Sequence, residues 1–320
     1  YKLQYMIYIP ITAVLIFAVF IYCRFAIKYN ITDKPDSRRS HNTSTIRGAG
    51  IIFPLSAMIW FYLNGIADIY FFLGLIFISL ISFLDDLVNL KPINRMITHI
   101  CAAFLLALQF DLFSLHPLIL LLIIILIVGW FNASNFMDGI NGITPLYSFL
   151  CLSFLYMIGY NENIYDINLI RIVMLSLLIF SFLNFRKQAI AFAGDVGSIS
   201  LSYIIAFLML NLMISTGELS YILFLSVYGI DSAITIIQRL LKREDIFKPH
   251  RTHLYQYLAN EKKWSHLLIS AIYSLIQLFI NLLVIFIIIP SDHSISLSVL
   301  VLSVLISIYL IIKNKVSKFS

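Results

Sequence analysis

Long apolar runs separated by short polar islands occupy most of the 320-residue chain. A helix needs about 20 mostly apolar residues to cross the hydrocarbon core of a bilayer, and eleven runs approach this length. They lie at 5–23, 49–65, 69–84, 97–111, 117–131, 143–160, 167–184, 197–214, 219–238, 265–290 and 294–312. The run at 97–111 is the weakest, because it is short and ends on Gln109 and Asp111, so ten spans remain an alternative. The pattern predicts an all-α polytopic membrane protein with about eleven transmembrane helices.

The composition supports this class. Hydrophobic residues make up 61% of the chain and charged residues only 12%, whereas charged residues are roughly a quarter of a soluble globular domain. We expect one integral membrane domain over residues 1–320. The three cysteines fall in apolar runs without paired spacing, which favours packing residues over disulfides or a zinc site.

The basic residues predict the orientation. An odd number of spans places the termini on opposite sides, and an outside N-terminus gives inside loops at 24–48, 85–96, 132–142, 185–196 and 239–264, followed by the C-terminal tail. Twenty of the 22 lysines and arginines then lie inside, as the positive-inside rule requires. The N-terminus is therefore predicted periplasmic and the C-terminus cytoplasmic. This topology explains the net charge of +6 without a nucleic-acid partner.

The first polar island, Asp33 to Gly50, is rich in basic residues and closes on Gly-Ala-Gly. Arginine forks suit phosphate, and glycine lets the backbone approach it. An ordinary inside loop is the alternative, but such a loop needs neither histidine nor the glycines. The candidate phosphate contacts are Lys34, Arg38, Arg39, His41 and Arg47.

Two islands carry acids at the inner membrane face. Asp85 and Asp86 end the third run, where adjacent carboxylates are costly unless they are paired, solvated or metal-bound. Because adjacent helical residues point about 100° apart, we expect them to have different roles. Asp195 lies between two glycines just before the eighth run, where a helix N-terminus suits phosphate and a carboxylate suits magnesium. A helix-ending acid pair and an N-cap aspartate are the alternatives.

The stretch from Asn132 to Gly142, NASNFMDGING, follows an apolar run directly. Asn135, Asp138 and Asn141 are spaced by three, so they would share a face if the segment were helical. Their amide and carboxylate groups could hydrogen-bond a base or a sugar. A polar linker is the alternative.

A further island, KPHRTHLYQYL, places Arg251 between His250 and His253. No second ligand pair of suitable spacing accompanies these histidines, which argues against zinc and favours contact with a diphosphate; a solvated loop is the alternative.

Asp231 lies inside the ninth run, where an acid is a functional candidate. An ion pair from Asp231 to Arg239 through Thr235, on one helical face, is an equal alternative.

All of these islands lie at one membrane face. Carboxylates, a helix start suited to phosphate, two histidines and several arginines together fit metal-assisted phosphoryl transfer between a water-soluble donor and a lipid phosphate. A transporter or lipid flippase is the main alternative from another class, but transporters place their polar groups near the bilayer midplane. A CDP-alcohol phosphotransferase fits less well, because Asp138-Gly139 is not followed by the Ala-Arg run of that family.

In order and content, these motifs resemble the polyprenyl-phosphate N-acetylhexosamine-1-phosphate transferases, glycosyltransferase family 4. This superfamily contains the bacterial lipid I translocase and the initiating enzymes of O-antigen and teichoic acid synthesis. The resemblance extends from Asp33 to Leu258, and the pieces NFMDGING and PHRTHLYQ look most like the O-antigen branch.

The resemblance implies a bacterial cytoplasmic (inner) membrane enzyme that faces the cytoplasm. It would transfer an N-acetylhexosamine 1-phosphate from a UDP-sugar to undecaprenyl phosphate, release UMP and so initiate O-antigen or another envelope polysaccharide. Mg²⁺ is the implied metal, with Mn²⁺ as an alternative, and a homodimer is an open alternative to a monomer. Lipid I translocase activity is the alternative within the superfamily.

Residue by residue, the resemblance implies that Asp195 binds the metal, that Asp85 is the base on the lipid phosphate and that Asp86 serves the metal or its water shell. Asn135 and Asp138 match nucleotide-sugar positions. The implied contacts with the diphosphate or sugar are His250, Arg251 and His253, with Asp231 as an acid near the inner end of a late span. The chain departs from the translocase pattern at Asn141, where the translocases have Asp, at Gly-Ala-Gly and in its interrupted histidine run. These departures affect the expected sugar more than the reaction.

Overall fold

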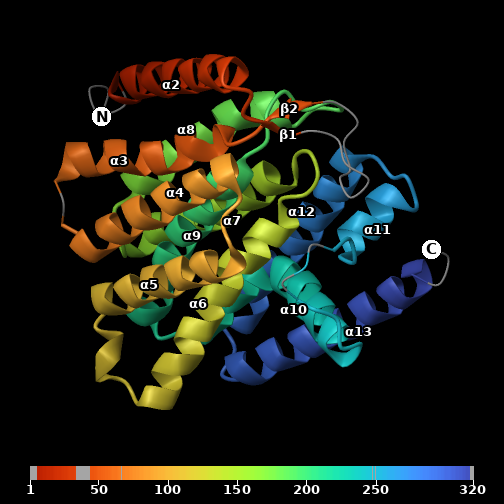
Figure 1. Ribbon diagram of the computed structural model, residues 1–320. Helices are drawn as coiled ribbons and strands as arrows, with labels where there is room; N and C mark the ends of the chain where they lie inside the picture. Colours follow the sequence, from red (N-terminus) through yellow and green to blue (C-terminus); the bar gives the residue numbers. More distant parts are fainter. Residues whose placement is uncertain (1–5, 34–43, 66, 247, 249, 318–320) are drawn as a thin grey trace.

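The computed structural model describes residues 6–33, 44–65, 67–246, 248 and 250–317, and in them the chain is mostly helical (Figure 1). The helices are α2 (Tyr8–Lys28), η1 (Ala49–Ile51), α3 (Ile52–Asn64), α4 (Ile69–Val88), α5 (Pro92–Gln109), η2 (Leu112–Ser114), α6 (Pro117–Met137), α7 (Ile143–Glu162), α8 (Ile167–Asn184), α9 (Gly194–Thr216), η3 (Leu219–Leu225), α10 (Ser226–Leu241), α11 (Leu254–Asn260), α12 (His266–Leu283), η4 (Val284–Ile288) and α13 (Ser294–Ser317). The all-α prediction is confirmed.

A two-stranded antiparallel sheet is formed by β1 (Thr32–Asp33) and β2 (Thr45–Ile46). Thr32 pairs with Ile46 and Asp33 with Thr45. The sheet flanks the basic part of the first island and leads into η1. Lys34, Arg38, Arg39 and His41, four of the predicted phosphate contacts, lie outside the described residues.

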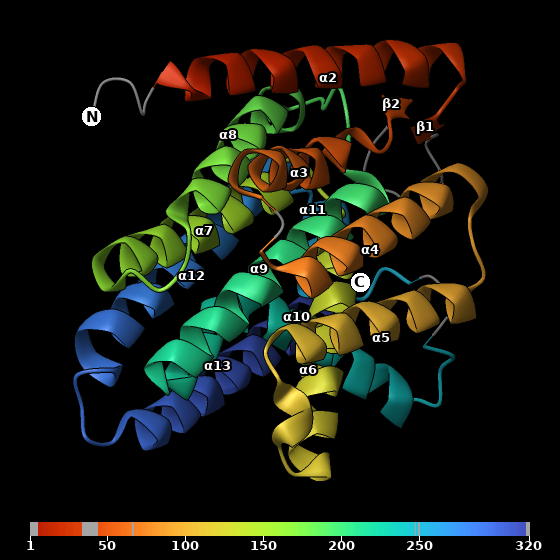
Figure 2. The same ribbon diagram turned by 90° about the vertical axis from the view of Figure 1, so that its left-hand side faces the viewer.

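Helix α9 runs through the middle of the bundle and packs against α3, α4, α6 and α7 (Figure 2). In its most apolar stretch 78% of the residues are buried, because the helix is apolar or small-sided all round rather than on one stripe. Ser198, Ser200 and Ser202 near its start are buried, and their small side chains allow neighbouring helices to approach closely. The N-terminus of α9 is thereby held at a fixed place in the core.

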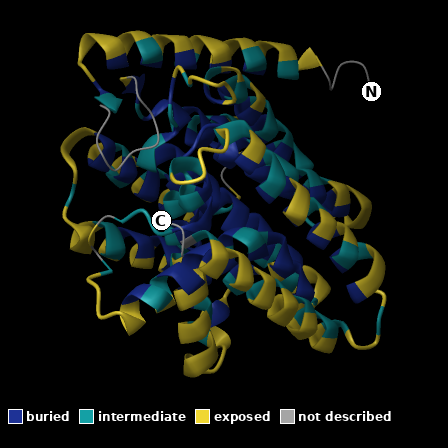
Figure 3. Cartoon of the chain, turned by 90° about the vertical axis from the view of Figure 1, so that its right-hand side faces the viewer, coloured by how far each residue is buried: buried dark blue, intermediate teal, exposed yellow. Residues whose placement is uncertain are grey.

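Helices α2 and α13 lie at opposite edges of the bundle (Figures 1 and 2), and Figure 3 shows mostly exposed residues along α2, the helix next to the N-terminus. In the most apolar stretch of α2 only 28% of the residues are buried, and in that of α13 only 6%. Their exposed side chains are largely apolar, as at Phe17, Phe20, Val299 and Ile311. A lipid environment satisfies such surfaces, whereas water does not.

All eleven segments predicted to span form helical structure. Nine helices in the described part of the chain are long and apolar enough to cross a membrane, so the protein is a multi-pass membrane protein. The other two segments are α3, with 13 residues, and α5, which includes Arg95 and His99. The exact number of crossings and the sides of the termini stay predictions.

Several predicted boundaries are wrong in an informative way. Helix α6 continues to Met137, so half of the predicted loop 132–142 is helical and the loop proper begins at Asp138. Likewise Asp85 and Asp86 lie in the last turn of α4, which shortens the predicted loop 85–96 to residues 89–91. The predicted span 219–238 is divided between η3, a 3₁₀ helix, and α10, and the span 265–290 ends in the π-helical turn η4.

Candidate active site

Backbone pairing brings the first island to the start of α9. Residues 46–50 run beside residues 190–193, joined by four backbone hydrogen bonds of 2.8–3.3 Å and a parallel bridge between Ile46 and Ala191. Arg47 is thus placed beside Asp195 in the first turn of α9, with a guanidinium nitrogen 3.4 Å from a carboxylate oxygen. Two islands that are about 150 residues apart in the sequence form one structure.

Asp86 anchors this junction. Its two carboxylate oxygens accept the backbone N–H groups of Asp195, at 2.9 Å, and Val196, at 3.0 Å. The Arg47 Nε lies 2.7 Å from the same carboxylate, whose side chain is completely buried. A carboxylate on the free N–H groups of a helix start is stabilised by those groups and by the helix dipole. The N-cap alternative for Asp195 is wrong, because Ala193 is the N-cap and the capping carboxylate comes from Asp86 on another helix.

Two glycines with a left-handed backbone lie at this junction. Gly194 has φ +72°, and a Cβ there would lie 2.5 Å from Asp86 Oδ2. Gly48 has φ +83°, and its Cβ would lie 2.3 Å from the Tyr22 hydroxyl. Both positions need a left-handed backbone and no side chain. Gly194 therefore makes room for Asp86, and Gly48 makes room for Tyr22.

Asp85 is placed differently, as the two-role prediction required. Its Oδ1 accepts the Leu90 N–H, while its buried Oδ2 has no hydrogen-bond partner among the described residues. That oxygen lies 3.4 Å from a guanidinium nitrogen of Arg95, and the same nitrogen lies 4.0 Å from an oxygen of Asp195. Asp85 and Asp195 are close enough for their side chains to interact directly. Two neighbouring carboxylates need a proton or a cation between them.

The donor set suits magnesium through Asp85 and Asp195. In the described part of the chain no group of three or more His, Cys, Asp or Glu side chains could hold a metal ion. Magnesium needs no such cage, because it is commonly held by one or two carboxylates together with waters and substrate phosphates. An orphaned carboxylate oxygen beside a second carboxylate fits this requirement. The prediction that Asp86 serves the metal does not fit, because backbone N–H groups and Arg47 already occupy its oxygens.

The end of α6 presents Asn135 and Asp138. The chain leaves the helix at Asp138, so the predicted common face of Asn135, Asp138 and Asn141 does not form. The Asp138 carboxylate accepts the Thr144 hydroxyl at 2.5 Å. Burial raises the pKa of Asp138 to about 7, and the negative charges of Asp195 and Asp86 act in the same direction. Asn141 instead donates to the carbonyl oxygens of Arg186, at 2.9 Å, and Lys187, at 3.2 Å, which ties two loops together.

The histidine segment docks on the end of α6. His253 and His250 are stacked at 5.0 Å between ring centroids, and Phe136 lies 5.8 Å from the former and 6.1 Å from the latter. The Tyr255 hydroxyl donates to the Phe136 carbonyl at 2.7 Å. Burial lowers the pKa of His250 to about 4, assisted by the positive charge of His253, so His250 is neutral at physiological pH. Arg251 lies between them in sequence and is partly buried.

Asp231 is wholly buried and lies beneath this segment rather than on its surface. Its carboxylate is 3.1 Å from His253 Nδ1. The alternative relay through Thr235 to Arg239 does not form, because Arg239 Nε pairs with Glu244 at 2.9 Å. Lys313 of α13 donates to Thr235 instead, at 2.6 Å. Asp231 is therefore placed to hold a histidine and not to touch a substrate.

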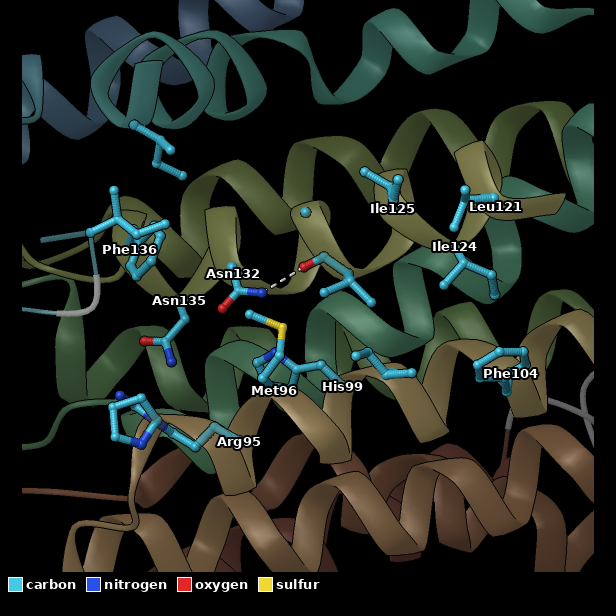
Figure 4. A pocket seen from close by; sticks show the side chains of 16 residues that line it. Arg95, Met96, His99, Phe104, Leu121, Ile124, Ile125, Asn132, Asn135 and Phe136 are labelled. Carbon is cyan, nitrogen blue, oxygen red and sulfur yellow. Dashed lines mark hydrogen bonds between the residues drawn. The ribbon is translucent and has the colours of Figure 1, made fainter. Parts of the chain in front are cut away.

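A cavity of about 540 Å³ lies between α5, α6 and α10. Most of its lining is apolar, from Phe104, Leu121, Ile124 and Ile125, while one end carries polar side chains (Figure 4). These polar side chains are Arg95, His99, Asn132 and Asn135. The polar end lies beside Asp85 and Asp195, because Arg95 contacts both of these carboxylates.

Arg95, His99 and Asn132 were not predicted as site residues. Arg95 was counted only as a basic loop residue, and His99 and Asn132 fell in or beside apolar runs. Spacing could have found them: Arg95 and His99 are four apart on α5, and Asn132 and Asn135 are three apart on α6, so each pair shares a helical face. Figure 4 shows both pairs at the same end of the cavity.

Comparison with known proteins adds the family. A model of glycosyl transferase family 4 matches residues 69–213, the stretch from α4 to α9. The chain is 27% identical over 260 residues to a "Probable undecaprenyl-phosphate N-acetylglucosaminyl 1-phosphate transferase" of Bacillus subtilis (strain 168), covering 73% of this chain and 71% of that protein. It is 28% identical over 260 residues to the "Undecaprenyl-phosphate alpha-N-acetylglucosaminyl 1-phosphate transferase" of Thermotoga maritima, covering 78% and 81%.

The chain also matches, over a shorter stretch, a relative from another branch of the superfamily. Over 128 residues the chain is 33% identical to the "Phospho-N-acetylmuramoyl-pentapeptide-transferase" of Streptococcus mutans, covering 39% of this chain and 37% of that protein. The family match contains both acid islands and the end of α6, whose side chains converge at the polar end of the cavity. The family model and the relatives from both branches support the superfamily of polyprenyl-phosphate sugar-1-phosphate transferases, glycosyl transferase family 4.

Proposed function

We propose that the protein transfers an N-acetylhexosamine 1-phosphate from a UDP-sugar to undecaprenyl phosphate, giving undecaprenyl-diphosphate-sugar and UMP. The observation that carries this proposal is the meeting of an apolar cavity with Arg95, Asp85 and Asp195 at its polar end. A lipid phosphate has the same division between a long apolar chain and a compact anionic head. The names of the two relatives that match most of the chain point to the same acceptor.

The lipid acceptor would lie along α5 and α6. Its isoprenoid chain would contact the apolar wall, and its phosphate would reach Arg95, whose guanidinium group suits phosphate oxygens. His99 and Asn135 line the same end and can hydrogen-bond the phosphate. This arrangement positions the nucleophile without requiring it to leave the bilayer.

Asp85 and Asp195 would hold Mg²⁺, with Mn²⁺ as a substitute, and the bound metal would neutralise charge on the phosphates of the donor. Asp86 holds Arg47 and the start of α9 in place, so that Asp195 keeps its position. Arg47, which is 80% buried at its side chain, adds a fixed positive charge beside Asp195. These groups stabilise a phosphoryl transition state mainly by position and charge.

The nucleotide sugar would bind between the end of α6 and the histidine segment. Asn135 and Asp138 offer amide and carboxyl groups to the sugar or base, and His250, Arg251 and His253 face the diphosphate. Lys34, Arg38, Arg39 and His41 of the first island, which lie outside the described residues, stay predicted phosphate contacts. All of these groups would lie at the cytoplasmic face, where UDP-sugars are made.

Direct attack is the favoured mechanism. An oxygen of the lipid phosphate forms a bond to the β-phosphorus of the UDP-sugar, the bond from that phosphorus to the bridging oxygen breaks, and UMP leaves with the electron pair. A lipid phosphate is already nucleophilic, so charge stabilisation and orientation suffice. A phospho-aspartate, or UMP release without lipid acceptor, would count against this mechanism.

The test is a donor panel. Purified protein in detergent with undecaprenyl phosphate and Mg²⁺ is offered UDP-N-acetylglucosamine, other UDP-N-acetylhexosamines and UDP-N-acetylmuramoyl-pentapeptide, and the lipid product is identified by mass spectrometry. We expect one UDP-N-acetylhexosamine to yield a lipid diphosphate sugar and equimolar UMP, and Asp195→Asn to abolish both. A product from the pentapeptide donor alone would favour the lipid I translocase, and uptake of UDP-sugar into vesicles without turnover would favour a transporter.

A further inference from the structure

Four helices meet on one buried carboxylate, that of Asp231 in α10. Hydrogen-bonding groups surround it on every side: His253 Nδ1 at 3.1 Å, the Leu254 N–H at 3.2 Å, the Tyr273 hydroxyl at 2.6 Å, the Tyr309 hydroxyl at 2.9 Å and the Thr235 hydroxyl at 3.4 Å. These groups come from α10, α11 with its N-cap, α12 and α13. A wholly buried side chain with this many donors is a built site and not an incidental contact.

These contacts determine the state of His253. Two tyrosine hydroxyls and a backbone N–H all donate to Asp231, so its oxygens act as acceptors, as an ionised carboxylate requires. The His253 Nδ1 at 3.1 Å must then carry the proton of that hydrogen bond. The Lys313 ammonium donates to the Thr235 hydroxyl at 2.6 Å, and that hydroxyl lies 3.4 Å from the same carboxylate.

The other ring nitrogen of His253, Nε2, makes no such hydrogen bond. Nε2 is buried and has no hydrogen-bond partner among the described residues. The ring stacks on His250 and lies against Phe136 at the end of α6, beside the polar end of the cavity. A buried polar atom without a partner costs free energy, and a ligand that binds here can supply that partner.

We propose that Asp231 is a positioning residue for the transfer reaction, holding His253 through Nδ1 so that Nε2 is oriented to hydrogen-bond the nucleotide sugar. Asp231 fixes the ring through Nδ1, and Nε2 is left as the polar atom whose hydrogen bond a bound ligand can complete. Tyr273, Tyr309 and the Lys313–Thr235 pair fix the carboxylate in turn. Helices α12 and α13 thereby support a site that they do not line. This inference rests on the proposed function.

A double-mutant cycle tests the coupling. Asp231→Asn and His253→Gln are made singly and together, and kcat is measured with the donor that the panel identifies. We expect each single change to lower kcat about 10- to 100-fold, the range for partners that orient a histidine, and the double variant to be no slower than His253→Gln alone. Independent losses that multiply in the double variant would overturn the proposal, because Asp231 would then act without His253.

Two conservative variants keep the test decisive if Asp231→Asn does not fold. Tyr309→Phe and Tyr273→Phe each remove one donor to Asp231 and keep the ring. We expect each to lower kcat in the wild-type background and to have no effect in the His253→Gln background. Equal losses in both backgrounds would contradict the proposal. Tyr156→Phe, a tyrosine that contacts Arg171 in α8, is the matched control and should retain wild-type kcat.

The same experiment separates the two levels of proposal. A wild-type protein that makes no lipid-linked sugar from any donor refutes the proposed function and this inference with it. An active wild-type protein with multiplying losses refutes only the role of Asp231.

Discussion

Asp85 and Asp86 are neighbours in sequence, yet their carboxylates have unlike surroundings. Asp86 is held by two backbone N–H groups and Arg47, whereas Asp85 keeps one buried oxygen without a hydrogen bond from the described residues. A satisfied buried carboxylate stabilises the fold, and an unsatisfied one is available for chemistry. The two residues should therefore respond differently to the same substitution.

Asp86→Asn should destabilise the protein, because it weakens the cap on α9 and removes the nearer of the two carboxylates that Arg47 contacts. We expect a loss of about 1.5–3 kcal/mol, the range for hydrogen bonds to charged groups. Asp85→Asn should cost less stability than Asp86→Asn, because its amide oxygen can still accept the Leu90 N–H, while it should abolish transfer. Thermal unfolding in detergent, followed by tryptophan fluorescence, measures the first effect and the UMP assay the second. Equal destabilisation by both changes would contradict this division.

Asp138 predicts a pH dependence of stability. Burial raises its pKa to about 7, above the ordinary value for an aspartate, so the folded state holds a proton that the unfolded state has already released. The stability linked to this proton is fully present below pH 4 and is lost as the pH rises to about 7. Asp138→Asn mimics the protonated form and should remove this loss.

The measurement compares Tm of the wild type and Asp138→Asn between pH 5 and pH 8. We expect the variant to gain on the wild type as the pH rises. A constant difference in Tm over this range would show that Asp138 titrates elsewhere. Thr144→Val, which removes the hydroxyl that Asp138 accepts, should enlarge the pH dependence, because that hydrogen bond lowers the pKa of Asp138.

At the scale of elements, the start of α9 depends on how closely it meets the segment before α3. Gly194 and Gly217 stand at the two ends of α9 with nearly the same backbone, φ +72° and +71°. A Cβ at Gly194 would meet Asp86 and Gly48, whereas a Cβ at Gly217 would meet nothing within 4 Å. Substitutions at Gly194 and Gly217 therefore distinguish the effect of backbone strain from that of a steric clash with Asp86.

Gly194→Ala and Gly217→Ala should both pay the left-handed backbone strain of about 1–2 kcal/mol. Only Gly194→Ala should displace Asp86 and Asp195, and we expect it to lower kcat about 100-fold, the effect of a misplacement of about 1 Å. Gly217→Ala should keep its turnover. Kinetic assays beside thermal unfolding of both variants make the comparison, and equal turnover would mean that the contact between Gly194 and Asp86 is dispensable.

The sequence predicted the elements better than their roles. Apolar length alone located the eleven apolar helical segments, although not the short helix α11. The charges of the loops placed the acid islands at one predicted membrane face. The different roles of Asp85 and Asp86 could not be predicted from the sequence pattern. They depend on which backbone N–H groups lie at the start of α9, and the pairing of residues 46–50 with residues 190–193 determines that. Arg95 and His99 were missed because the first fell in a predicted loop and the second in an apolar run, whereas α5 carries both.

At the scale of the whole molecule, the orientation is the remaining prediction. Eleven crossings place residues 185–193 in the cytoplasm with the site, and residues 163–166 in the periplasm. Burying charge in the bilayer costs several kcal/mol, so the polar islands must all lie at a water interface, and the basic excess places that interface inside. A reversed molecule would direct the site away from the compartment that holds UDP-sugars.

Cysteine labelling tests this orientation. In a background with Cys23, Cys101 and Cys151 replaced by alanine, single cysteines are introduced at Lys187 and at Asn163, both exposed and in short connections between helices. A membrane-impermeant maleimide added to spheroplasts should label Asn163→Cys at once and Lys187→Cys only after the membrane is permeabilised. Labelling of Lys187→Cys in sealed spheroplasts would reverse the predicted topology. Labelling of both would mean that the connections differ from an eleven-span arrangement, since an odd number of crossings, α8 alone, separates the two positions.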